Sequence, residues 1–426
     1  MFSFHIERSK ERTWLYMLML IVLLISSAIV LTKGHYFLLG DLDKPNNDDV
    51  KYIHSAKLLI NEGVLAYNSG NEPSTFIMPL FPIMLAGFMK VFGQGDAAII
   101  AFRLFQCLQQ AASLYFIFII ARYMFNSRAA IIACVISALY WPDYFSSGVI
   151  LTESTFRLVI LALIAVSIAA VQRKRAGWYL GVGVLVALAA YFKPHASLFP
   201  AIFLILWWKE KYSLKQMITS MLYIGAAYVV CLMPWWIRNW LTFHQLIIFT
   251  TSGGSPFLLG TRIDWNLPSA DFFKLYPEYD PKTIFEGSDS VAIQKGIDIL
   301  KYGFTYEPLK YLHWYTIGKF YNLYMIPYYW RPIWPFGKSL MFAIQYGFML
   351  VALAGMVWAM IRESFARLMP VLLTLAYFTV IYMPFVAFSR YGYPNMVLFI
   401  MFAAYLLDQL LYFTKNRSLS KRTVRM

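Results

Sequence analysis

Charged residues are scarce in this sequence, and hydrophobic ones are in excess. Only 14% of the 426 residues are charged, whereas 60% are hydrophobic and 18% are aromatic. A water-soluble domain cannot bury so much apolar surface, so the composition excludes that class. Apolar stretches of roughly 15–25 residues recur along the chain, as expected for helices that cross a bilayer. They lack the short alternating pattern of a β-barrel. The sequence therefore predicts an all-α polytopic membrane protein.

Several functional signatures are also missing. The three cysteines lie inside apolar stretches, so neither a disulfide framework nor a thiolate metal site is expected. There is no Walker loop, no dinucleotide fingerprint and no HExxH motif, which argues against soluble nucleotide-driven chemistry. The net charge of +15 comes from Lys and Arg gathered in short segments between apolar stretches. That distribution is typical of cytoplasmic loops, so we expect anionic membrane lipids as partners and no nucleic acid.

The apolar stretches predict one membrane domain, residues 1–426, with ten spans of about 20 residues. With the N-terminus inside, every predicted cytoplasmic segment is basic, which indicates that both termini are cytoplasmic. We expect a bacterial plasma-membrane protein whose first span is a retained signal anchor. The predicted spans are 14–31, 97–121, 129–145, 150–171, 178–192, 196–208, 216–236, 340–361, 368–387 and 392–413.

This topology leaves two long external loops, residues 32–96 and 237–339. In the first loop, apolar residues after Asp48 recur at helical spacing, which predicts an amphipathic helix lying in the membrane interface. Residues 78–93 predict a second one.

Two adjacent acids, Asp48 and Asp49, precede the first of these helices. On local grounds they cap it: Asn47 or Asp48 is the N-cap and Asp49 complements the helix dipole. Alternatively, one acid is a general base whose pKa is raised by its neighbour. Two such carboxylates would also suit a divalent cation, but no further ligand is evident, so we assign no metal site.

Other charged residues fall near the predicted outer membrane boundary. The cations are either snorkelling anchors or, taken together, a site for a phosphate headgroup. Glu153 and Arg157 are four residues apart and are expected to pair with each other. The candidate cations are Lys193, His195, Arg238 and Arg390.

The order of several motifs resembles the GT-C superfamily of integral-membrane glycosyltransferases. The chain looks closest to the bacterial branch that is similar to protein O-mannosyltransferases and lipid A aminoarabinose transferases. The first-loop segment "DDVKYIHSAKLLINEGVLAY" matches an Asp-x-x-x-Tyr pattern at Asp48 and Tyr52. The other motifs are "LTES" (151–154), "FKPHASLFP" (192–200), "PWWIRN" (234–239) and "RYGYPNMVLF" (390–399).

This resemblance implies a polyprenyl-phosphate-linked sugar donor, an active site outside the membrane and a first-loop acid as catalytic base. Asp48 matches the base, with Asp49 beside it, and in-line attack would invert the anomeric centre. The acceptor, whether lipid, glycan or protein, does not carry over. The residues expected to bind substrate are Tyr52, Glu153, Lys193, His195, Arg238 and Arg390.

Two other classes remain open. A transporter or flippase of lipid-linked sugars would share the outer cations but would need charged residues deep in both membrane halves, and few are present. A non-catalytic scaffold would tolerate replacement of Asp48.

Overall fold

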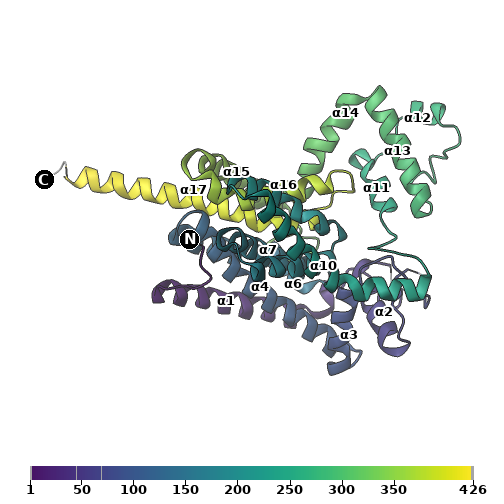
Figure 1. The fold of residues 1–426 in the computed structure, drawn as a ribbon, viewed down its shortest axis with the longest axis horizontal. Coiled ribbons are helices and arrows are strands. Elements are labelled where there is room, and N and C mark those ends of the chain that lie inside the picture. Colours follow the sequence, from purple (N-terminus) through teal and green to yellow (C-terminus); the bar gives the residue numbers. More distant parts are fainter. Residues whose placement is uncertain (1, 45, 69, 424–426) are drawn as a thin grey trace.

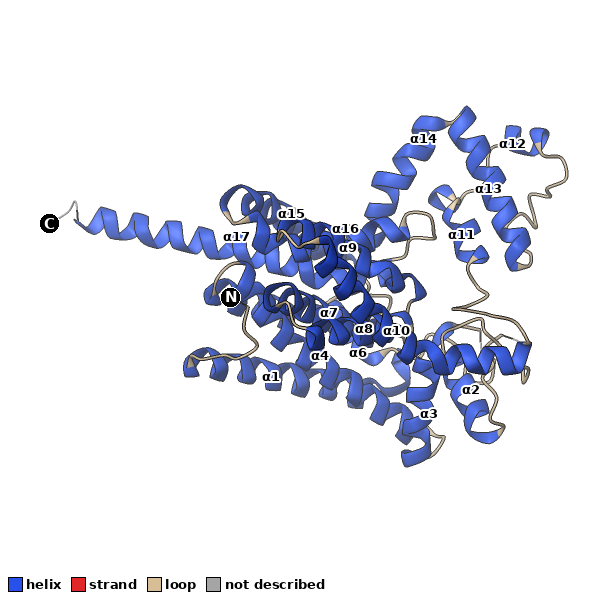
Figure 2. Cartoon of the chain, viewed as in Figure 1, coloured by secondary structure: helices blue, strands red, loops and turns tan. Residues whose placement is uncertain are grey.

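The computed structural model describes residues 2–44, 46–68 and 70–423, and these ranges are mostly helical. Figure 2 shows helices joined by loops, and the described ranges contain no strand, only one isolated bridge between Ile333 and Phe336. The predicted all-α membrane fold is confirmed.

The described part of the first half of the chain contains ten α-helices and two short 3-10 helices, among them α2 and α7, which later contribute to the site. Their bounds are α1 (Ser9–Lys33), η1 (Gly34–Phe37), α2 (Asp48–Asn61), α3 (Leu80–Phe92), α4 (Asp96–Met124), α5 (Ser127–Ala138), α6 (Trp141–Gly148), α7 (Glu153–Arg173), α8 (Ala176–Ala190), η2 (Pro194–Ala201), α9 (Ile202–Lys209) and α10 (Leu214–Phe243).

The second half contains a group of short helices and then three long ones. Their bounds are α11 (Gly254–Gly260), η3 (Ile263–Trp265), α12 (Ala270–Leu275), α13 (Asp289–Tyr306), α14 (Pro308–His313), the π-helical turns η4 (Trp314–Gly318) and η5 (Tyr321–Met325), α15 (Lys338–Arg362), α16 (Phe365–Tyr382) and α17 (Ser389–Thr423).

Among the described residues, seven helices are long and apolar enough to cross a membrane. They are α1 with η1, α4, α7, α10, α15, α16 and the first part of α17. The pair α5–α6 would add an eighth, although it bends by 55° at its break. The prediction of ten spans is not confirmed. α8 has only 15 residues, and the predicted span 196–208 is divided between η2 and α9, so both are shorter than the roughly 20 residues that a straight span needs.

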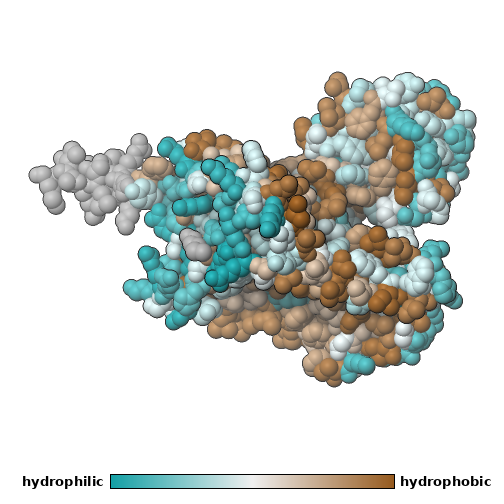
Figure 3. Space-filling view, viewed as in Figure 1, coloured by the Kyte–Doolittle hydropathy of each residue, from teal (hydrophilic) through white to brown (hydrophobic). Residues whose placement is uncertain are grey.

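Both termini lie at one end of the bundle, and the two long loops lie at the other (Figure 1). The first loop contributes α2 and α3, and the second contributes α11 to α14. In Figure 3, hydrophilic residues gather at the end that carries the termini, whereas hydrophobic residues cover α1. Which end faces the outside stays a prediction.

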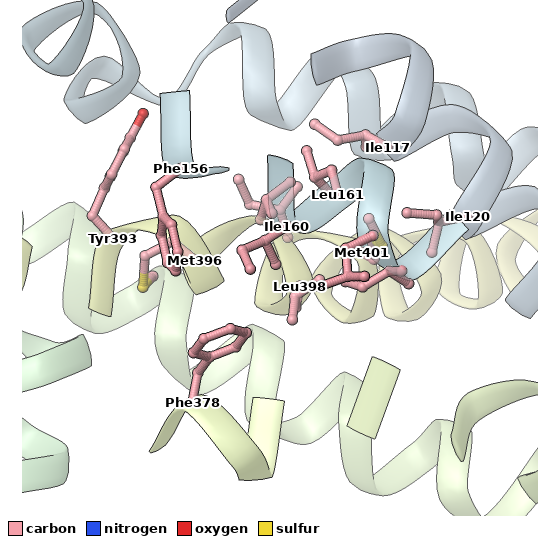
Figure 4. Packing of buried hydrophobic residues seen from close by; sticks show 14 of the residues in the cluster. Ile117, Ile120, Phe156, Ile160, Leu161, Phe378, Tyr393, Met396, Leu398 and Met401 are labelled. Carbon is pink, nitrogen blue, oxygen red and sulfur yellow. The ribbon is translucent and has the colours of Figure 1, made fainter. Parts of the chain in front are cut away.

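The centre of the bundle is an apolar core between α4, α7, α16 and α17. Figure 4 shows side chains from these helices meeting there, among them Ile117, Ile120, Phe156, Ile160, Leu161, Phe378, Met396, Leu398 and Met401. α1, in contrast, leaves Trp14, Leu20 and Leu24 more than half exposed, as suits a helix that faces lipid.

Helix α2 forms as the sequence predicts, but its apolar face packs against the protein and not against lipid. Val50, Ile53 and Ala56 are buried in the protein core, and α2 packs on α3. This contact fixes the orientation of α2, and therefore of the two acids in its first turn.

Helices α11 to α14 have a core of their own and project from one end of the bundle, so we call them the outer domain. Its buried residues are Leu258, Phe272, Ile284, Ala292, Ile299, Tyr302 and Tyr311.

Candidate active site

The two adjacent acids of α2 face different surroundings. Asp48 Oδ1 accepts a hydrogen bond from the Tyr67 hydroxyl at 2.8 Å, and Oδ2 accepts one from Arg390 Nη1 at 2.6 Å. Asp49 is completely buried and accepts from the backbone N–H groups of Leu39, at 2.6 Å, and Gly40, at 3.2 Å. Neighbouring residues on a helix point about 100° apart, which explains the divergence. Asp48 faces the candidate site, and Asp49 anchors the chain that precedes α2.

Local structure at the start of α2 settles which residue caps the helix. The N-cap is Asn47, whose side chain accepts from the backbone N–H of Asp48. Asp48 and Asp49 both lie in the first turn, where a negative charge suits the helix dipole.

The pKa values of the two carboxyls move in opposite directions. Burial by itself would raise the pKa of Asp48, but the charge of Arg390 and the hydrogen bonds from Arg390 and Tyr67 outweigh it and hold that pKa below 3.8. Burial raises the pKa of Asp49 above 3.8, although its backbone hydrogen bonds oppose the change. Asp48 is thus an ionised carboxylate, and a third of its side chain remains exposed.

A second ion pair lies next to the first, across one aromatic ring. The Arg390 guanidinium donates to the Tyr391 hydroxyl at 3.1 Å, and Lys193 Nζ lies 4.7 Å from the centre of the Tyr391 ring. Lys193 also donates to Glu153 at 2.9 Å. Acids and cations from α2, α7, α17 and the loop before η2 therefore form one cluster.

Tyr52 and His195 border this cluster without hydrogen bonding to Asp48. The Tyr52 ring packs 5.5 Å from Tyr67 and 4.8 Å from Phe81, and burial, followed by the charge of Asp48, raises the pKa of its hydroxyl. The His195 ring lies 4.5 Å from that of Tyr382, which in turn stacks on the Tyr391 ring at 5.2 Å.

Arg238 lies apart from the cluster, although the sequence placed it with the other cations. Its guanidinium donates to the Ser74 carbonyl at 3.2 Å and to Asn239 at 3.0 Å. It borders a largely apolar cavity of about 480 Å³ between α10, the end of α2, the loop that follows α2 and the start of α3, with Tyr191 after α8 at its edge. The cavity is lined by Leu59, Gly63, Val64, Leu65, Pro73, Pro79, Leu80, Ile83, Tyr191, Pro234, Trp235, Arg238 and Thr242.

The expected pairing of Glu153 with Arg157 is wrong. Glu153 pairs with Lys193, whereas Arg157 forms a fully buried ion pair with Asp143 of α6 and donates to Tyr393 at 2.9 Å. Each side chain takes a partner from another part of the chain, Glu153 from the loop before η2 and Arg157 from α6, because the four-residue spacing does not fix which neighbour it faces.

Within the described ranges, no group of three or more His, Cys, Asp or Glu side chains could hold a metal ion. Asp48 and Asp49 also have different hydrogen-bond partners, and a divalent cation beside them stays a prediction.

The sequence did not identify three residues as contacts of the charged side chains in this region. Tyr67 lies at the end of the quoted first-loop segment, but the motif drew attention to Tyr52. Tyr391 directly follows Arg390 in the sequence, but nothing in the sequence indicated that its ring lies between Arg390 and Lys193. Asp143 lies in a short polar stretch that gave no signal of its partner Arg157.

Comparison with known proteins bears on the fold. Residues 72–237 match the family model for dolichyl-phosphate-mannose-protein mannosyltransferases. An oligosaccharyltransferase from Archaeoglobus fulgidus, in complex with an inhibitory peptide and a dolichol-phosphate, has a TM-score of 0.57 at 13% identity. The match covers 97% of this chain and 52% of that one. The apo form of the Archaeoglobus fulgidus oligosaccharyltransferase gives 0.51 at 12% identity, covering 94% and 52%. The chain has the GT-C fold.

This fold, together with the match to the mannosyltransferase family model, supports the GT-C resemblance drawn from the sequence motifs. ArnT from Cupriavidus metallidurans, bound to undecaprenyl phosphate, is 16% identical, and the match covers 92% of this chain and 76% of that one. Its TM-score is 0.39, which is too low to indicate a shared fold. No curated protein matches. The chain spans about half the length of the oligosaccharyltransferases, and at such identities the GT-C likeness establishes the fold and not the reaction.

Proposed function

We propose that this protein is a membrane glycosyltransferase. It transfers a sugar from a polyprenyl-phosphate carrier to an acceptor hydroxyl or amine, at the end of the bundle that carries α2. The observation that carries the proposal is the partly exposed, ionised Asp48 held against Arg390, with Lys193 beside them. The GT-C fold and the mannosyltransferase family match support the same reaction class.

The donor fits two features of this end of the molecule. Arg390 and Lys193 supply positive charge for a phosphate, and Arg can hold it with two parallel hydrogen bonds. The apolar cavity beside Arg238 offers a place for the first isoprene units of the carrier. One of the similar structures is described as holding a dolichol-phosphate, which is a carrier of this class.

The reaction is a single displacement at the anomeric carbon. The acceptor atom attacks that carbon, and its proton passes to Asp48. The bond from the anomeric carbon to the phosphate oxygen breaks, and the electron pair leaves with the polyprenyl phosphate. Arg390 and Lys193 stabilise the charge that develops on this leaving group. Attack from the face opposite the phosphate inverts the anomeric centre.

The Asp48–Arg390 pair gives the base a way to change strength during the reaction. In the absence of donor, Arg390 keeps the pKa of Asp48 low, which makes a weak base. When the phosphate engages Arg390, part of this attraction is lost while the burial of Asp48 remains. The pKa of Asp48 then rises, as general-base catalysis requires.

The remaining assignments follow from this arrangement. We propose that Tyr52 and Glu153 shape the sugar site and that Arg238 stays close to the lipid. The proposed orientation puts this end of the bundle outside the plasma membrane. A divalent cation is not needed for the step, because the two cations already face the leaving group.

The test is to incubate the purified protein in liposomes with polyprenyl-phosphate sugars and candidate acceptors, and to follow the products by mass spectrometry. The proposal expects free polyprenyl phosphate and a glycosylated product in equal amounts. Movement of intact donor between leaflets without any product would instead identify a flippase.

A further inference from the structure

The segment of residues 383–388 joins α16 to α17 and ends just before Arg390. The outer domain holds this segment along its length. The backbone N–H of Val386 donates to the Pro256 carbonyl of α11 at 2.8 Å, and the Phe388 ring stacks on Trp265 at 5.3 Å. The position of Arg390 therefore depends on a contact between two parts of the chain that are distant in sequence.

The backbone of α11 approaches this segment closely at Gly260. A Cβ atom at that position would lie 2.7 Å from the Pro384 carbonyl oxygen and 2.6 Å from the Phe385 carbonyl carbon. Trp314 fixes the other side of Gly260 by donating its indole N–H to the Gly260 carbonyl at 3.0 Å.

Lys319, between η4 and η5, completes the contact. It is fully buried, and Nζ donates to the carbonyls of Met383 and Phe385, the latter at 2.9 Å. Nζ also lies 3.8 Å from the centre of the Tyr315 ring. Carbonyls just past a helix C-terminus lack helical donors and favour a cation, and α16 ends at Tyr382.

This lysine is costly to bury. No carboxylate among the described residues forms an ion pair with it, and burial lowers its pKa to about 7. A buried cation without an acidic partner is disfavoured relative to an apolar side chain. A contribution to stability therefore does not explain why a lysine is buried here. Its hydrogen bonds to the two carbonyls of Met383 and Phe385 do explain it.

We propose that Lys319 is a positioning residue for the transfer reaction. By holding the carbonyls of Met383 and Phe385, it fixes the segment 383–388 and so places the Arg390 guanidinium between Asp48 and the donor phosphate. Its catalytic consequence rests on the proposed function, but the geometry it maintains does not.

The first arm of the test needs no activity. Hydrogen exchange is measured in the full-length protein at the Val386 amide, for the wild type, Lys319→Met and Lys295→Met. Lys295 is the matched control, because it also donates to two backbone carbonyls, those of Thr283 and Glu286, but within the outer domain. We expect exchange at Val386 to rise about tenfold or more in Lys319→Met, from the loss of the two hydrogen bonds that hold the carbonyls of Met383 and Phe385. Unchanged exchange overturns the proposal.

The second arm measures transfer. We expect Lys319→Met to lower kcat/KM by about tenfold, Lys319→Arg to restore most of it, and Lys295→Met to have little effect. In an Arg390→Lys background, Lys319→Met should cause no further loss, because it acts through Arg390. A full tenfold loss in that background overturns the proposal. Absence of transfer in the wild type, with exchange behaving as expected, contradicts the proposed function and leaves the positioning contact standing.

A second variant covers the case in which Lys319→Met does not fold. Gly260→Ala inserts a methyl group against the backbone of residues 384–385 and should loosen the same segment. We expect faster exchange at Val386 and lower kcat/KM together. Faster exchange with unchanged kcat/KM, in a wild type that is active, would show that the segment does not position Arg390.

Discussion

Asp48 and Asp49 have the same chemistry but opposite surroundings, and the structure separates their roles. The sequence identified both acids and the helix that they begin. It did not reveal which one faces inward, because that depends on how α2 packs against α3 and on the distant residues Arg390 and Tyr67. Such partners, up to 342 residues away, leave no signal in local spacing.

The buried Asp49 leads to a prediction about stability. Asp49→Asn keeps one acceptor for the backbone N–H groups of Leu39 and Gly40 but buries an amide that has no evident acceptor. We expect it to lower the free energy of unfolding by about 1–3 kcal/mol. Thermal unfolding in detergent measures this. A stability equal to that of the wild type would contradict the anchoring role of Asp49.

A second prediction at this scale concerns pH. Because the pKa of Asp48 in the folded protein lies below its ordinary value of 3.8, its pair with Arg390 contributes stability above that pH and loses it as pH falls through the folded pKa. The difference in unfolding temperature between wild type and Asp48→Asn should therefore stay constant from neutral pH down to about pH 4. A wild type that instead gains stability relative to Asp48→Asn as the pH falls from neutral to about pH 5 would show a raised pKa.

Among the elements, α6 and α7 show most clearly where local reasoning stops. The spacing of Glu153 and Arg157 predicted a pair within α7, but α6, which bends by 55° from α5, supplies Asp143 to Arg157. The bend falls where the predicted span 129–145 would have continued straight. A broken span such as α5–α6 leaves polar groups at its break. These groups can lie inside the bundle only if other helices supply their hydrogen-bond and charge partners.

This contact predicts a large effect of one substitution. Arg157→Met leaves Asp143 buried without its cation and should destabilise the protein by about 3–5 kcal/mol. Combining it with Asp143→Asn should recover part of that loss, since the uncompensated charge is gone. Unfolding temperatures of the two variants test this, and a loss below about 1 kcal/mol for Arg157→Met would mean that the pair contributes little.

For the whole molecule, the all-helical membrane fold could be predicted because runs of apolar residues directly report burial in lipid. The outer domain could not, since its core depends on aromatic residues spread over a long loop without a clear period. The number of spans could not be predicted either, because short helices such as α8 have the apolar composition of a span but not its length.

The predicted orientation can be tested by labelling. In a variant without Cys107, Cys134 and Cys231, a single cysteine is placed at Glu278 in the outer domain or at Arg175 at the opposite end. A membrane-impermeant thiol reagent added to intact cells should label the Glu278→Cys protein and not the Arg175→Cys protein. The reverse pattern would put the candidate site in the cytoplasm.

The central claim is that Asp48 is the base of a sugar transfer, and its most direct test is the activity of Asp48→Asn. Asp96→Asn is the control, because Asp96 also lies in the first turn of a helix, α4, but pairs with His35 outside the cluster. In liposomes supplied with polyprenyl-phosphate sugar and acceptor, Asp48→Asn should lose at least about a hundredfold in transfer rate, as expected for loss of a general base. It should remain folded, and Asp96→Asn should keep wild-type activity. Wild-type transfer by a folded Asp48→Asn protein would contradict the account.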